Sequence, residues 1–299
     1  MTTGAIEYFN RDTKTIEVEA VYGDAFLRWA YCNPIGRLSV FLVAKRALFS
    51  RWYGWRMKRP VSRNRVKPFI RDFNVDAKEF VCALDEFSSF NDFFVRKLKA
   101  EARPVDPDEL TVVFPADGRH LGFQDISRAT GFFVKGQRFH LEAFLGDSQL
   151  SERFQNGTAV LSRLCPLDYH RFHFPFQGTP ASPSLINGPL SSVNPIALRR
   201  NLAILWRNKR MLTLLDTEKL GSVLIMEIGA TNVGSIQQTF IPDRPVRKGA
   251  EKGFFEFGGS ATFTLFEAGR VQLSEDLVHH SAQCRELYAR MGDRLGRAC

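Results

Sequence analysis

The sequence has few cysteines and no closely spaced pair of them. Five cysteines are scattered over 299 residues, and none forms a C-x-x-C pair. This pattern argues against a disulfide framework and against a zinc site, and it predicts a reducing compartment. The five are Cys32, Cys82, Cys165, Cys284 and Cys299.

Long hydrophobic runs are also missing. The longest nearly apolar run covers residues 38–44, which is far too short to cross a bilayer. The first twenty residues are polar, carry both signs of charge and contain no apolar core of the kind that a secretory signal needs. We therefore expect neither a secretory signal nor a membrane-spanning helix.

Acidic residues are absent from one long stretch. Residues 37–67 contain ten Lys or Arg and no Asp or Glu, so the rest of a chain with net charge +9 is close to neutral. Apolar and aromatic residues recur at helical spacing within it and predict an amphipathic helix over 37–52. Such a helix suits the headgroup layer of an anionic membrane, although a helix docked on the protein core has the same pattern. The stretch matches no nucleic-acid-binding motif, so we expect no nucleic acid partner.

Two regions differ in their sequence pattern. Residues 1–105 contain a short strand or two and then several helical segments, among them residues 65–75, 76–84 and 90–99. Asp76 and Asn91 are candidate N-caps. Residues 106–299 contain short apolar runs interrupted by Gly, Pro, Asn and Asp, which predict a compact β-rich domain. Within it we expect one helix or loop at residues 140–147 and a helical or frayed tail after Leu273. The predicted fold class is α+β, a helical N-terminal region followed by a β-rich domain.

Four short stretches contain the chemically interesting residues. Each has a simple structural explanation on its own: Asp117-Gly118 is a turn dipeptide, and Gly258-Gly259-Ser260 is turn punctuation. His170 and His173 lack a third nearby ligand, so we expect no metal site. The stretches are FPADGRH (114–120), LCPLDYHRFHFP (164–175), MEIGATNVGSI (226–236) and KGFFEFGGSAT (252–262).

Taken together, these stretches resemble the phosphatidylserine decarboxylase family of pyruvoyl-dependent membrane enzymes. The resemblance extends from about Leu48 to about Arg270. It includes FNDFFVRKLKAEARPVD, FPADG, FFVKG, DYHRFHFP, NPIALR, VGSI and KGFFEFGGS in that order. The order and spacing of these elements carry more weight than any one of them.

The resemblance implies that the chain is a proenzyme that cuts itself between Gly259 and Ser260. The products would be a β chain (1–259) and an α chain (260–299), and Ser260 would become the covalent pyruvoyl cofactor. Asp117 and His173 would act with Ser260 as a charge relay during the cut. The pyruvoyl group would then form a Schiff base with phosphatidylserine, and His170 would donate the proton that completes decarboxylation to phosphatidylethanolamine and CO₂.

Further expectations follow from the same resemblance. Both histidines must approach Ser260, so the segment DYHRFH should be bulged or looped rather than regular β. Backbone N–H groups of residues 229–231 could stabilise an oxyanion, and Arg199 and Lys135 are candidate phosphate ligands by charge alone. Residues 37–67 would bind the anionic surface of the membrane. The resemblance also implies a homodimer. The chain length and the lack of a recognisable targeting segment, and not the resemblance, predict a peripheral location on the cytoplasmic face of a bacterial inner membrane.

One residue departs from the family pattern, because Ala261 replaces the usual threonine after the serine. The departure leaves the rate of self-cleavage open. It also leaves open an unprocessed homologue that binds lipid surfaces without decarboxylase activity. A soluble pyruvoyl-dependent amino-acid decarboxylase and a basic nucleic-acid-binding module are two further hypotheses.

Overall fold

The structure is a computed structural model that describes residues 5–20, 29, 33, 47–129, 131–230, 236–258 and 260–299. For residues 47–51 only the backbone is described. The helices are α3 (Ala47–Lys58), α4 (Val66–Phe73), α5 (Phe90–Phe94), α6 (Leu141–Leu145), α7 (Ser148–Phe154), α8 (Pro195–Leu198), α9 (Ile204–Arg207) and α10 (Glu275–Ala282). Short 3-10 helices cover Pro60–Arg65, Ala77–Glu79, Ala100–Ala102 and Ile126–Arg128. None of the described helices is long and apolar enough to cross a membrane.

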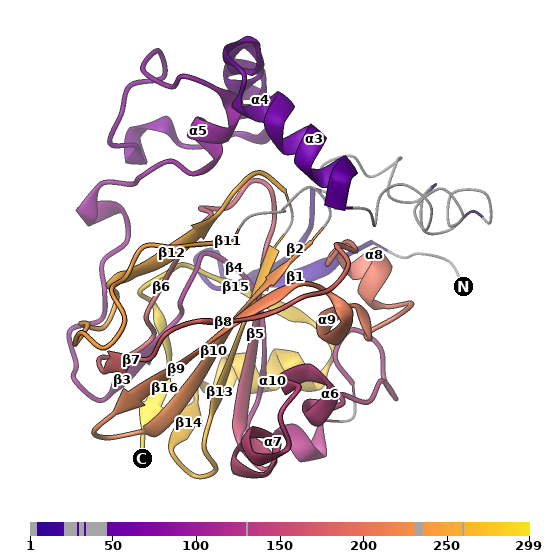
Figure 1. Cartoon of the computed structure of the whole chain (residues 1–299), viewed down its shortest axis with the longest axis vertical. Helices are drawn as coiled ribbons and strands as arrows, with labels where there is room; N and C mark the ends of the chain where they lie inside the picture. The colour runs from indigo at the N-terminus through magenta and orange to yellow at the C-terminus, as the bar shows by residue number, and fades with distance from the viewer. Residues whose placement is uncertain are drawn as a thin grey trace.

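A ten-stranded sheet forms the centre of the molecule (Figure 1). Its strands follow the order β2-β1-β15-β4-β5-β13-β10-β9-β7, and β8 also pairs with β9. They are β1 (Glu7–Asn10), β2 (Thr15–Val18), β4 (Gly118–Phe123), β5 (Thr158–Leu164), β7 (Thr179–Pro180), β8 (Ser184–Ile186), β9 (Arg210–Thr217), β10 (Gly221–Gly229), β13 (Ser260–Phe266) and β15 (Glu286–Ala289).

Two three-stranded sheets accompany the large one, in the orders β11-β12-β6 and β14-β16-β3. Their strands are β3 (Thr111–Val113), β6 (Arg171–His173), β11 (Ile236–Gln238), β12 (Glu251–Phe255), β14 (Val271–Leu273) and β16 (Arg294–Ala298). The fold is therefore α+β with a β-rich domain, as the sequence predicts.

Each face of the large sheet has its own apolar core. Along β13, Phe263 and Leu265 alternate with Thr264 and Phe266, so successive side chains enter opposite cores. On the Phe263 side, α6, α7, α8 and α9 supply the covering side chains, and Figure 1 shows these helices along one side of the sheet. On the Phe266 side, the covering layer comes from α10 and from strands of the smaller sheets.

The helices α3, α4 and α5 lie over the β11–β12 hairpin, at the top of Figure 1. They share a separate aromatic core that includes Phe69, Phe90, Phe93 and Phe94. The expected helix at residues 76–84 is wrong, because only one 3-10 turn forms there, capped by Asp76. The N-cap of α5 is Ser89 rather than Asn91.

Other predicted elements have mixed outcomes. Helices α4 and α6 lie where the sequence predicts helical segments. The expected tail after Leu273 is only partly helical, because α10 is followed by β15 and β16. In the predicted helix over 37–52, residues 37–46 lie outside the described residues, and the backbone from residue 47 onward is helical.

Candidate active site

Ser260 is the first residue of β13, in the middle of the large sheet. Its backbone pairs with Gly229 of β10 on one side and with Leu164 of β5 on the other. Its side chain is completely buried. Gly258 has a φ of 144°, a backbone conformation that residues with a side chain rarely adopt. The backbone of Ser260 is thus held by a strand on each side, while the segment that precedes it turns at Gly258. Gly259 lies outside the described residues.

The His170 ring lies beside the Ser260 hydroxyl, with 3.4 Å between Nδ1 and Oγ. On its other side, Nε2 lies 2.9 Å from the carbonyl oxygen of Cys165. Because a carbonyl can only accept, Nε2 carries the hydrogen and Nδ1 is free to accept the hydroxyl proton. The ring also stacks on Phe94 at 3.8 Å between centroids, which fixes its plane.

Burial, and secondarily the nearby positive charge of Arg96, together lower the pKa of His170 to about 3. The Arg96 guanidinium is itself held by the carbonyls of Leu167 and Asp168. His170 is therefore neutral at physiological pH. A neutral imidazole acceptor beside a buried serine hydroxyl is the arrangement that activates a serine as a nucleophile.

His173 and Asp117 occupy separate hydrogen-bonding positions nearby. The His173 ring donates from Nδ1 to the carbonyl of Gly249 at 2.9 Å, and its Nε2 accepts from the Tyr169 hydroxyl at 3.3 Å. Asp117 accepts two charged hydrogen bonds from Arg103, at 2.9 and 2.6 Å, and one from the Met291 amide. Among the described residues, no hydrogen bond joins Asp117 to His173 or His173 to Ser260. The predicted charge relay stays a prediction.

The predicted bulge or loop in the segment with both histidines is only partly confirmed: residues 168–170 lie outside any strand, whereas Arg171–His173 form strand β6. His170 precedes β6, directly after a turn, and β12 has a bulge at Lys252 opposite β6. The irregularity brings His170 to Ser260. It does not bring His173 into hydrogen-bond contact with that hydroxyl.

Comparisons with known proteins show the family to which the chain belongs. Residues 90–297 match the family model for phosphatidylserine decarboxylase. A curated relative from Chlamydia trachomatis serovar L2, named phosphatidylserine decarboxylase proenzyme, is 43% identical over 290 residues, which is 97% of this chain and 96% of the relative. Relatives with the same name from Fusobacterium nucleatum and Clostridium kluyveri are each 40% identical over 291 residues, covering 97% of this chain and 97% and 98% of the relatives. The chain belongs to the phosphatidylserine decarboxylase family.

The sequence does not predict a cluster of buried polar side chains near Ser260. Lys252 and Glu227 are both fully buried, with 2.8 Å between Nζ and Oε1, and Gln238 bonds to both. Glu227 pairs with Thr262 across β10 and β13, so it lies on the face of the sheet that carries Ser260. The available signal is a single glutamate inside the apolar run GSVLIMEIG.

Ala261, the departure from the family pattern, points away from Ser260. It is fully buried and packs in the apolar core on the α8 side of the sheet. The side chain at this position therefore contacts that core and not the serine hydroxyl.

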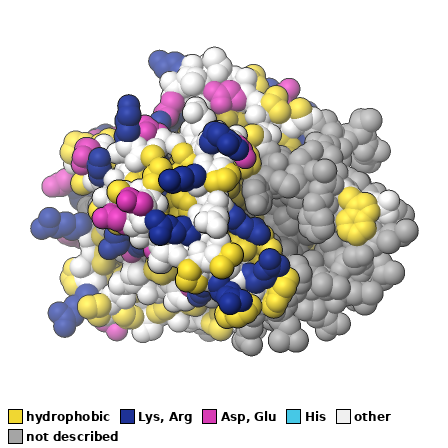
Figure 2. All heavy atoms as spheres, turned by 90° about the horizontal axis from the view of Figure 1, so that it is seen from above, with side chains coloured by type: hydrophobic (Ala, Val, Ile, Leu, Met, Phe, Trp, Pro, Cys, Tyr) yellow, Lys and Arg dark blue, Asp and Glu magenta, His cyan; other side chains and the backbone are white. Residues whose placement is uncertain are grey.

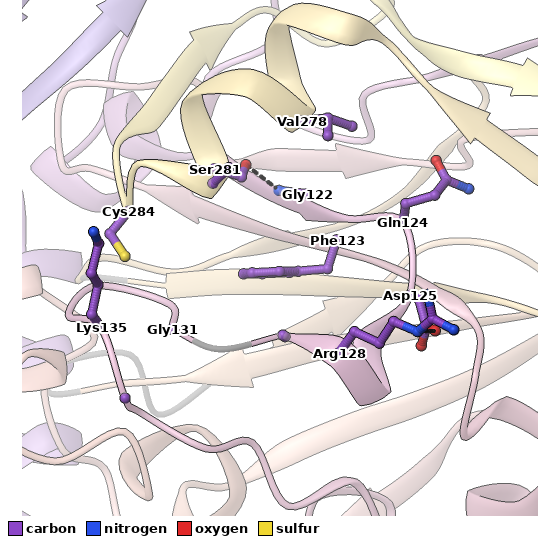
Figure 3. A pocket seen from close by; sticks show the side chains of 13 residues that line it. Gly122, Phe123, Gln124, Asp125, Arg128, Gly131, Lys135, Val278, Ser281 and Cys284 are labelled. Carbon is purple, nitrogen blue, oxygen red and sulfur yellow. Dashed lines mark hydrogen bonds and ion pairs between the residues drawn. The ribbon is translucent and has the colours of Figure 1, made fainter.

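Two of the candidate ligands, Lys135 for the phosphate and the Gly229 amide for the oxyanion, are not placed to act at Ser260. Lys135 lines a surface pocket of about 600 Å³ together with Arg128 and Cys284 (Figure 3). This pocket lies at the Phe123 end of β4, opposite the end next to Asp117, so Lys135 is not part of the Ser260 site. The Gly229 amide already donates to the Lys209 carbonyl at 2.9 Å, and Thr231 lies outside the described residues.

Arg199 follows α8, and its Nε atom is buried without a hydrogen-bond partner in the described structure. Helix α8 packs on the Ala261 side of the sheet. Arg199 thus has no contact that assigns it to the site.

Within the part of the chain that the structure describes, no group of His, Cys, Asp or Glu could hold a metal ion.

Proposed function

We propose that this chain is a self-processing phosphatidylserine decarboxylase that converts phosphatidylserine to phosphatidylethanolamine and CO₂. The observation that carries the proposal is the contact between the Ser260 hydroxyl and the neutral His170 ring, two residues after Gly258, a glycine with positive φ. The names of the curated relatives give the reaction and the proenzyme character.

Self-cleavage uses groups of the chain and one water molecule. The Ser260 hydroxyl gives up its proton, and Oγ bonds to the carbonyl carbon of Gly259. The C–N bond between the two residues breaks, and the nitrogen takes a proton, which leaves an ester. Loss of the α-proton of residue 260 expels the Gly259 carboxylate, and water then replaces the nitrogen as ammonia and leaves a ketone. The products are a β chain (1–259) and an α chain (260–299).

The roles of the surrounding groups follow the family resemblance. Asp117 and His173 serve the cut as a relay, which requires them to leave their hydrogen bonds to Arg103 and Gly249. His170 serves the decarboxylation. Its Nδ1 atom faces residue 260 and carries no proton in the resting protein, so it first takes up the proton that the substrate ammonium group gives up and then delivers it to the reacting carbon. Residues 1–105 contain the membrane-associating region, and residues 106–299 form the catalytic domain, to whose large sheet β1 and β2 add two strands.

The buried site fits a pyruvoyl group derived from Ser260. The group needs no ligands beyond the chain that carries it, and the full burial of Ser260 and His170 limits the access of bulk water to residue 260. When formed, it supplies a conjugated carbonyl that takes up the electrons released with CO₂. The side chains of the protein hold the amine substrate beside His170 and shield the reacting carbon from bulk water.

The membrane surface is the proposed location of the substrate. Trp52 and Trp55 of α3 are 48% and 55% exposed, and Arg56 and Arg59 stack on their rings at 5.1 and 4.8 Å. Figure 2 shows Lys and Arg interspersed with apolar side chains on this face of the molecule. Aromatic rings with adjacent cations suit an anionic headgroup layer, so residues 37–67 are the proposed contact, with residues 37–46 outside the described residues.

Intact mass of the purified protein tests the proposal. We expect two chains divided between Gly259 and Ser260, with the smaller lighter by one ammonia than a peptide beginning with serine. The cleaved protein should release CO₂ from phosphatidylserine vesicles, and Ser260→Ala should stay whole and inactive. A wild-type chain that stays whole but binds anionic vesicles would instead support an unprocessed lipid-binding homologue.

A further inference from the structure

The segment that enters the proposed cleavage site has no regular secondary structure. Strand β12 ends at Phe255 and β13 begins at Ser260, and residues 256–258 between them belong to neither strand. A nucleophile fixed in β13 can attack a carbonyl only if that carbonyl is also held in place. Contacts outside the sheets must therefore position this segment.

The described contacts of the segment come from the helical region. Lys58 of α3 forms an ion pair with Glu256 at 2.7 Å. The Phe257 amide donates to Oδ1 of Asn91 at 3.0 Å, within the buried part of α5. The Phe257 ring packs against Phe90 and Phe94 at 5.2 and 4.9 Å between centroids.

Helix α5 also holds His170, whose ring lies beside the Ser260 hydroxyl. Asn91 and Phe94 are three residues apart and so lie on the same face of α5. Phe94 stacks on the His170 ring, while Asn91 accepts from the amide two residues before Gly259. One short helix thus contacts both His170 and the entering segment.

We propose that Asn91 is a positioning residue for self-cleavage. Its side-chain oxygen fixes the Phe257 backbone. This positions the chain so that the Ser260 hydroxyl can attack the carbonyl carbon of Gly259. The inference rests on the proposed function, and it assigns Asn91 to the first step, in which the Oγ–C bond forms and the C–N bond breaks. Asn91 is 8% exposed, and an acceptor there is needed because the Phe257 amide is buried.

The test compares Asn91→Leu, which keeps the number and branching of the side-chain heavy atoms but removes the acceptor, with Asn91→Asp, which keeps the oxygen. Each protein is made by cell-free translation, and the half-time of conversion to two chains is followed. We expect at least a tenfold slower cut for Asn91→Leu and a cut within threefold of wild type for Asn91→Asp. Asn91→Ala replaces the leucine variant if that variant is insoluble.

Melting temperatures of the same variants in the uncleavable Ser260→Ala chain separate positioning from stability. A buried carboxylate is expected to lower the melting temperature at least as much as leucine does. The ranking by cleavage rate should therefore differ from the ranking by stability. Cleavage rates that follow the melting temperatures would overturn the inference.

Hydroxylamine identifies the step, because it cuts the ester as soon as the ester exists. It should not rescue Asn91→Leu if formation of the ester is slow. Rescue by hydroxylamine, or a cut of Asn91→Leu within twofold of wild type, would overturn the positioning role of Asn91. It would leave the proposed function standing. A wild-type chain that never cuts would overturn the proposed function, and the inference with it.

Discussion

Lys252 and Glu227 form an ion pair that is completely removed from water. Burial raises the pKa of Glu227 and lowers the pKa of Lys252, so each charge depends on the other. Removing one partner leaves an uncompensated buried group. We expect Lys252→Met to lower the free energy of unfolding of the Ser260→Ala chain by about 3–5 kcal/mol, measured by urea denaturation.

The double variant Glu227→Leu/Lys252→Met is the control for this prediction. Replacing a buried ion pair by apolar side chains of similar size is often close to neutral. The double variant should therefore be more stable than Lys252→Met alone. If both are equally unstable, the lost lysine packing and not the unpaired glutamate is responsible.

His120 makes folding sensitive to acid. Its Nδ1 accepts from Ser162 and its Nε2 donates to the carbonyl of Ala289, and burial lowers its pKa to about 3. Between that value and the unfolded value near 6.5, the unfolded chain binds more protons, so stability falls as the pH falls. We expect His120 to contribute a loss of about 2 kcal/mol between pH 7.5 and pH 5.

Urea denaturation of the Ser260→Ala chain and its His120→Gln variant at several pH values checks this contribution. His170, with a pKa also near 3, stays in both proteins and adds the same slope to each. Only the difference between the two curves belongs to His120. Parallel curves would contradict the low pKa of this histidine.

Motif residues and their partners differ in how well the sequence predicts them. Ser260 and His170 lie in motifs, and the family resemblance identifies both from the sequence alone. Asn91 has the local pattern of an N-cap, but its side chain bonds to an amide 166 positions away, while Ser89 caps the helix. Local pattern carries no information about a partner so distant in sequence.

At the level of elements, the N-terminal hairpin β1–β2 is part of the large sheet. Strand β1 pairs with β15, and Glu19, just after β2, contacts the buried guanidinium groups of Arg163 and Arg119. Arg163 also holds Glu286 of β15 at 2.7 Å. The hairpin thus closes a buried charge network that spans both proposed chains.

We expect Glu19→Gln to destabilise the Ser260→Ala chain by about 3 kcal/mol, because two buried arginines lose a carboxylate. The matched control is Glu7→Gln on the same hairpin, where the side chain is exposed and the change should be within about 0.5 kcal/mol. Urea midpoints of both variants give the comparison. Equal midpoints would mean that the other carboxylates compensate for Glu19.

The C-terminal elements could not be predicted from local pattern. Residues 286–298 are rich in charged side chains and give no clean alternation, so the sequence suggests a frayed tail. They form strands because β4, β1, β3 and β14 supply their partners from distant parts of the chain. Tertiary pairing overrides weak local preference here. By contrast, α4 is predicted correctly because its own apolar periodicity determines it.

At the level of the whole molecule, the proposed α chain is interleaved with the β chain. Strand β13 lies between β5 and β10, β15 between β1 and β4, and β16 pairs with β3. We expect the two chains to co-elute in size-exclusion chromatography after the cut and to separate only in denaturant. Recovery of a free α chain from native protein would contradict this topology.

Because the two chains are interleaved, refolding of the protein depends on whether the chain has already been cut. The uncut precursor folds in a unimolecular reaction, whereas the cut protein could refold only by the meeting of two chains. Its apparent stability would then depend on protein concentration, and its lifetime on the height of the barrier to unfolding. A mature molecule that unfolds once at low concentration is expected to lose its activity for good, because the central strand of its sheet is no longer covalently attached to its neighbours.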